Sequence, residues 1–106
     1  MATNLDYINY VIAQIDQFSN VRYRKMFGEY MVYVNDKPIL LVCDNTVFVK
    51  KLDELSHLLA DAECSIPYSG AKEHYVLNID DSELVNKVIQ ILERCTKLPI
   101  KKNKKK

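Results

Sequence analysis

The sequence contains few side chains that could carry out acid–base or nucleophilic chemistry. Its two histidines, His57 and His74, have no serine or cysteine set beside them by a recognisable pattern. A histidine in that setting is expected to be solvated or bonded locally. We therefore expect a protein that is not an enzyme, with no catalytic residue and no small-molecule substrate. A pocket that held His74 together with Cys64 or Glu73 would argue the opposite.

Paired carboxylates and glycines do not indicate a catalytic or phosphate site either. Asp53-Glu54 and Asp80-Asp81 stand at predicted helix starts, where the helix dipole accounts for acidic residues. Gly28 and Gly70 are the only glycines, so a glycine-rich phosphate loop is excluded. We expect no bound cofactor.

Cysteine usage and the first residues bear on the compartment. The cysteines are odd in number and widely spaced, without a C-x-x-C pair, so neither a disulfide framework nor a metal site is indicated. They are Cys43, Cys64 and Cys95. The opening "MATNLDYINY" lacks the basic start and apolar run of a signal peptide, and no apolar segment approaches the length of a membrane span. We expect a cytoplasmic protein with no membrane partner.

The charge is divided unevenly along the 106 residues. A net charge of +1 includes five lysines in the last six positions, and without them ten basic residues face fourteen acidic ones. Those lysines are Lys101, Lys102, Lys104, Lys105 and Lys106. The length fits one domain, so we expect a folded unit over 1–99 and a disordered lysine-rich tail over 100–106. Such a tail either contacts phosphates or only aids solubility.

Helical periodicity recurs in three segments. Apolar residues at helical spacing predict a helix over 3–18, capped by Thr3, and a shorter helix over 52–62 with Asp53 as its cap. The clearest helix begins at Asp80 as its cap and ends before Pro99.

Extended segments fill the space between these helices. Residues 21–50 are rich in β-branched and aromatic residues, and the pairs Asn35-Asp36 and Asp44-Asn45 are typical of tight hairpin turns. Two further strands flank a turn at 69–72. The predicted order, α-β-β-β-α-β-β-α, favours a two-layer α+β fold with an antiparallel sheet of about five strands and helices packed on one side.

The strands carry apolar side chains on both faces of the predicted sheet, whereas a half-covered sheet should alternate apolar and polar residues. Within the strands, Tyr30, Val32 and Val34 oppose Met31 and Tyr33, Leu40 and Val42 oppose Ile39, Leu41 and Cys43, and Val47 and Val49 oppose Phe48. Either the C-terminal helix or the segment 21–28 covers the second face, or a partner protein does. For the partner we expect a second copy of the chain, joined through the sheet face or an edge strand in a homodimer.

The stretch "RYRKMFGEY" at 22–30 combines cations with a bend. Gly28 permits a backbone turn that a side chain would hinder, and Phe27 would anchor that turn in the core. Arg22, Arg24 and Lys25 would then form a charged rim. A purely structural corner is the alternative interpretation.

In this stretch the chain resembles the N-terminal domain of the TfoX/Sxy family. That family shows an amphipathic helix, a V-R-x-R-x-M-F-G-G-Y-G-x-Y pattern, a hairpin and a "D-D-T-L-Y-L-K" strand, and this chain has "VRYRKMFGEYMVY", "NDKPILLVCDNTVFVKK", a "PYSG" strand and a closing helix. The matching positions are Val21, Arg22, Arg24, Met26, Phe27, Gly28, Tyr30, Tyr33 and Lys50.

The resemblance implies a fold like that of secretion chaperones and a role without catalysis. That role would be regulation or protein interaction, linked to competence gene expression in bacteria, with the transcription machinery as a partner. The family's competence regulators carry a second, C-terminal domain, so the chain is expected to be a single-domain member.

The expected contact residues for a protein partner follow from the rim and the resemblance. They are Arg22, Arg24, Lys25, Met26, Phe27, Gly28, Tyr30 and Tyr33. The alternative function is nucleic-acid binding, with the rim cations acting together with the five tail lysines.

Overall fold

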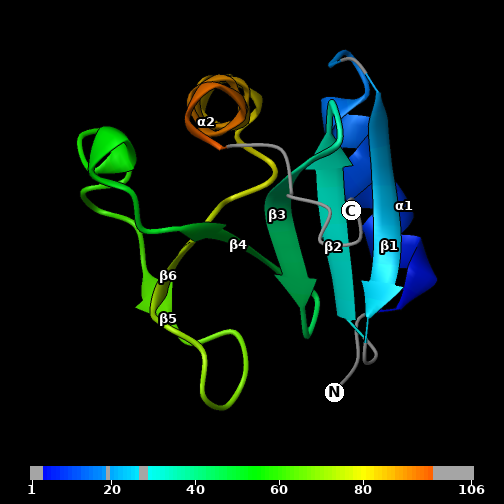
Figure 1. Cartoon of the computed structure of the whole chain (residues 1–106), viewed down its shortest axis with the longest axis horizontal. Helices are drawn as coiled ribbons and strands as arrows, with labels where there is room; N and C mark the ends of the chain where they lie inside the picture. The colour runs from blue at the N-terminus through cyan, green and yellow to red at the C-terminus, as the bar shows by residue number, and fades with distance from the viewer. Residues whose placement is uncertain (1–3, 19, 27–28, 97–106) are drawn as a thin grey trace, which may run out of the picture.

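The computed structural model describes residues 4–18, 20–26 and 29–96, and Figure 1 shows their arrangement. In chain order the elements are α1 (Leu5–Ile15), β1 (Val21–Met26), β2 (Glu29–Val34), β3 (Lys37–Cys43), β4 (Thr46–Lys50), the 3-10 helix η1 (Asp53–Leu55), β5 (Cys64–Ser65), β6 (His74–Val76) and α2 (Ser82–Cys95).

The strands form one antiparallel sheet in the order β1-β2-β3-β4-β6-β5. The predicted α+β class with an antiparallel sheet is confirmed. The sheet has six strands rather than about five, because residues 21–26 pair with β2 as an edge strand of their own. The idea that this segment folds across the sheet is therefore wrong for residues 21–26.

The two hairpin turns form where the sequence predicted them. Asn35 and Asp36 have φ of 53° and 67°, and Asp44 and Asn45 have φ of 52° and 54°. Tight hairpin turns need these positive values, and asparagine and aspartate tolerate them better than other side chains. The turns fix the register of β2, β3 and β4.

Side-chain caps begin both α-helices. The carboxamide of Asn4 accepts a hydrogen bond from the Tyr7 amide at 2.8 Å, whereas the expected cap Thr3 lies outside the described residues. In α2 the carboxylate of Asp81 accepts from the Leu84 amide at 3.2 Å. The cap is thus one residue beyond the predicted Asp80, whose carboxylate instead accepts a hydrogen bond from a tyrosine hydroxyl of α1.

The predicted helix over 52–62 is wrong. Only Asp53–Leu55 forms a short 3-10 helix, followed by turns, and the first turn has no side-chain cap because Leu52 occupies the cap position. Leu55 and Leu59 still point inward, with exposed fractions of 0% and 2%. The apolar spacing therefore identified the buried residues but not the backbone conformation.

The core lies between the helices and one face of the sheet. It joins residues of both α-helices to β2, β3, β4 and β6, so the helices share one side, as predicted. Its members include Ile8, Val11, Ile15, Tyr30, Val32, Val34, Leu40, Val42, Val47, Val49, Val85, Val88, Ile89 and Leu92. Burying each such side chain contributes roughly 1.5–3 kcal/mol, so this cluster supplies most of the driving force for folding.

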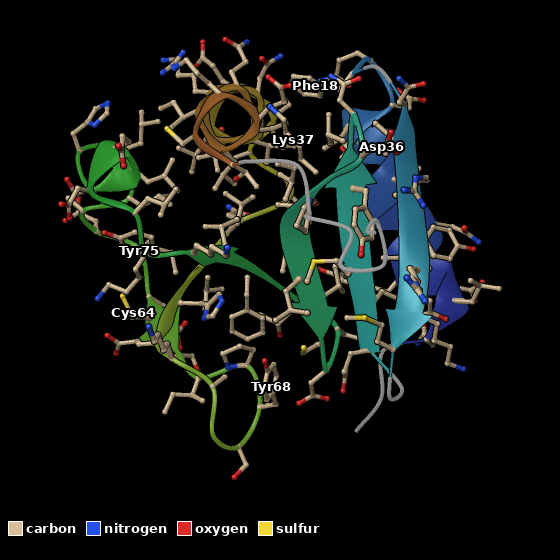
Figure 2. The ribbon with its side chains drawn as sticks, viewed as in Figure 1. Phe18, Asp36, Lys37, Cys64, Tyr68 and Tyr75 are labelled. Carbon is tan, nitrogen blue, oxygen red and sulfur yellow. The ribbon has the colours of Figure 1, made fainter. Side chains whose placement is uncertain are left out.

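Lys37 ties the first hairpin to α2, and Figure 2 shows it beside that helix. Its Nζ donates to the carbonyl oxygen of Glu93 at 2.7 Å and lies 3.4 Å from the Glu93 carboxylate.

In the described part of the chain, no helix is long and apolar enough to cross a membrane.

Candidate partner-binding surface

We use the term second face for the side of the sheet turned away from α1 and α2. Cross-strand pairing aligns one row of its side chains over neighbouring strands: Arg24 pairs with Met31, Met31 with Leu41, and Leu41 with Phe48. Met31 and Leu41 are half-buried, and neither packs against the core, whose members lie on the other face. The row thus presents apolar side chains on three adjacent strands, ending at an arginine.

Ile39, which was expected to point away from Leu40, lines a cavity on the second face together with Met31 and Leu41. A bulge between Val32 and Tyr33 shifts the pairing of β2 with β3, and Ile39 joins the core cluster with 4% of its surface exposed. A bulge bends a strand and redirects the residue it releases from the ladder.

A loop over residues 66–72 forms the wall of a groove on the second face. Tyr68, which is 57% exposed, stands on this loop on the side that faces β3 in Figure 2. Tyr68, Met31 and Leu41 line both a cavity of about 530 Å³ towards β4 and a second one of about 460 Å³ towards β2. Because these residues are shared, the two cavities adjoin, and we call them together the sheet groove.

Cations stand at the rim of the sheet groove. Lys50, Lys51 and Lys72 line its β4 end. The Nζ of Lys51 lies 3.0 Å from a carboxylate oxygen of Glu73, and this hydrogen bond raises the lysine's pKa. Among the residues that the structure describes, Lys50 and Lys72 make no such ion pair, so their charges remain available to a ligand.

His74 also lines the β4 end of the sheet groove. Its Nδ1 lies 2.7 Å from the carbonyl oxygen of Lys72, so Nδ1 carries the proton that it donates there. Its ring meets the Phe48 ring edge-on, with centroids 6.5 Å apart. Neither Cys64 nor Glu73 is among the residues that line the groove beside it.

The opposite end of the sheet groove contains Glu29 and Cys43. The Glu29 carboxylate accepts a hydrogen bond from the Asp44 amide at 3.1 Å. Cys43 is 1% exposed, and burial, reinforced by the charges of Glu29 and Asp44, raises the pKa of its thiol to about 11. The thiol is therefore neutral at physiological pH and acts as an apolar part of the wall.

The predicted rim is divided by the alternation of β1. Arg22, Arg24 and Met26 share the second face, whereas Lys25 points to the other side. Arg22 makes an ion pair with Asp36 at 3.0 Å and lies 4.9 Å above the Tyr33 ring. The structure thus brings two of the three rim cations together.

The remaining predicted contact residues separate into three groups. Tyr33 is half-buried on the second face, whereas Tyr30 is 5% exposed and packs in the core, so its ring is not a surface group. Phe27 and Gly28 lie outside the described residues, as do the five tail lysines and residues 97–100.

Several groove residues were not among the predicted contacts. Leu41 and Phe48 were recognised as second-face residues, and Lys50 as a match to the family pattern, but none was assigned a binding role. Tyr68 and Lys72 come from a loop that only the tertiary fold brings over the sheet. No local pattern in the sequence would have identified them.

A metal site is absent over the described ranges, where no three histidine, cysteine, aspartate or glutamate residues gather closely enough to bind an ion. The fold and this surface define a small α+β domain with helices on one face of an antiparallel sheet and a groove on the other. The model of the TfoX N-terminal domain matches residues 13–90, and the chain belongs to that family.

A curated relative supports the match without adding a function. The chain is 37% identical over 76 residues to a protein of Spirochaeta aurantia described as an uncharacterized 12.7 kDa protein in the trpE 5' region. The aligned part covers 72% of this chain and 66% of the relative, slightly less than two thirds of its length.

Proposed function

We propose that this protein is a non-enzymatic regulatory module that acts by binding another protein through the second face of its sheet. The observation that carries the proposal is the sheet groove, where apolar side chains of three strands stay uncovered by either α-helix. Interfaces are enriched in methionine, tyrosine and arginine, and these residue types surround the groove. Membership of a family linked to competence regulation supports a regulatory role, with the transcription machinery as the expected partner.

Charge argues for a different protein rather than a second copy of the chain as the partner. A twofold dimer through the second face would bring the same patch against itself, so the cations Arg24 and Lys50 of one copy would face cations of the other copy. Along the β1 edge, Arg22, Arg24 and Lys25 oppose strand pairing between copies in the same way, since charged residues commonly protect exposed strand edges.

The test is affinity capture with matched baits. Met31→Lys puts a charge on the groove floor, and Leu5→Lys makes the same type of change on α1, where Leu5 is 50% exposed. We expect specific proteins to be captured by the unmodified chain and by Leu5→Lys, but to be lost with Met31→Lys. Mass spectrometry of the three captures provides the measurement.

Further outcomes separate the alternatives. Light scattering that shows Met31→Lys dissociating a dimer would identify a second copy as the partner. Capture that disappears after nuclease treatment would identify nucleic acid. A set of proteins identical for all three baits would contradict binding through the groove. A Met31→Lys strain whose transcript levels change in the same way as those of a deletion strain would support the regulatory role.

A further inference from the structure

The sheet groove joins an apolar floor to a rim whose charge differs from that of the rest of the domain. All fourteen acidic residues lie within residues 4–96, whereas six of the fifteen basic residues follow position 96, so the described part of the chain is acidic overall. Against this background Arg24 ends the apolar row at β1, while Lys50 and Lys72 border it beyond β4. The β4 end of the groove therefore attracts negative charge although the domain as a whole does not, whereas Glu29 places a carboxylate at the β2 end.

The geometry of the floor sets the size of the group that can bind. Met31, Leu41 and Phe48 occupy three neighbouring strands in one row, which spans about 10 Å at the usual spacing between strands. Residues i and i+7 of a helix are separated by about the same distance. Two or three apolar side chains of a single peptide segment can therefore contact the row together.

We infer that the sheet groove receives an acidic amphipathic peptide segment of the partner protein, an inference that rests on the proposed function. Apolar side chains of the segment contact Met31, Leu41 and Tyr68, and its aspartates or glutamates meet Lys50, Lys72 and Arg24. The methionine side chain is flexible and polarisable, so the floor adapts to apolar groups of different shape.

Single-stranded nucleic acid, the other acidic polymer, fits this surface less well. Such ligands stack their bases on exposed aromatic rings. Phe48 is only 6% exposed, and the guanidinium of Arg22 lies over the Tyr33 ring, which leaves Tyr68 as the exposed ring of the groove among the described residues.

The experiment selects ligands without assuming their sequence. A displayed library of random 15-residue peptides is selected on the purified full chain, and recovered peptides are tested by fluorescence anisotropy in 50 mM and 500 mM salt. We expect recovered peptides to combine aspartate or glutamate with leucine, isoleucine, phenylalanine or methionine. Met31→Lys should abolish their binding.

Charge reversal of the rim provides the second measurement. The double variant Lys50→Glu/Lys72→Glu should weaken binding roughly tenfold in 50 mM salt and clearly less in 500 mM salt, since exposed charge pairs are screened. The matched control is Lys87→Glu, an exposed residue of α2 on the other side of the domain, which should leave the affinity unchanged. Thermal melting within a few degrees of the parent chain verifies that each variant is folded.

The outcomes distinguish this inference from the proposed function. Neutral or basic peptides that Met31→Lys still blocks would overturn the acidic ligand but leave protein binding by the groove in place. Peptides that Met31→Lys does not affect would overturn both. A single-stranded 15-nucleotide DNA that competes better than the recovered peptides would replace the peptide by nucleic acid.

Discussion

The two faces of β3 can be tested with one pair of substitutions at neighbouring leucines. Leu40 is 0% exposed and lies in the core, whereas Leu41 is half-buried on the second face. Leu40→Ala removes a fully buried side chain and should lower the free energy of unfolding by about 2–5 kcal/mol. Leu41→Ala removes partly hydrated surface and leaves no closed cavity, so its cost should be about 1 kcal/mol.

The assay is urea denaturation followed by circular dichroism, with thermal melting as a second measurement. For a domain of this size 1 kcal/mol corresponds to roughly 4–8 °C, so a difference of about 1–4 kcal/mol should lower the melting temperature of Leu40→Ala by roughly 4–32 °C relative to Leu41→Ala. Equal losses would refute the division of the sheet into a structural face and a binding face. Below both melting temperatures, Leu41→Ala should weaken peptide binding while Leu40→Ala retains it.

Three other predictions concern a turn, an ion pair and a thiol. At Asp36, φ is 67°, so Asp36→Ala should lose about 1–2 kcal/mol in urea denaturation and Asp36→Gly clearly less, although both remove the same carboxylate. Lys37→Met breaks two contacts with Glu93 and should cost about 1–2 kcal/mol, whereas Lys51→Met should cost clearly less because its ion pair is more exposed. Because burial raises the pKa of Cys43 from 9.0 to about 11, the folded state holds this proton more tightly than the unfolded state. Stability should therefore fall as pH rises from about 9 to 11, and a Cys43→Ala variant that showed the same fall in urea titrations would contradict this assignment.

The hairpins were predictable because their determinants are local. Asparagine and aspartate occupy all four turn positions with positive φ between β2 and β4, and this preference is visible in the residue types alone. The apolar row on the second face follows from the same turns, since they fix which residues pair across the strands. The sequence therefore predicted apolar side chains on both faces of the sheet.

The segment 52–62 and the loop 66–72 were not predictable in the same way. The first has apolar spacing that suits a helix, but Leu52 provides no side-chain cap, and the chain forms a 3-10 helix and turns before it reaches β5. The second contributes Tyr68 and Lys72 to the groove only because β5 and β6 return the chain to the edge of β4. Contacts of that kind depend on the complete topology.

The core and the sheet groove lie on opposite sides of the sheet, and this separation affects which parts of the sequence can vary. The core residues lie on one side of the sheet. The wall formed by residues 66–72 is a surface loop outside this core, so its sequence can vary. Changes in that loop can alter which sequences are recognised without a large loss of stability.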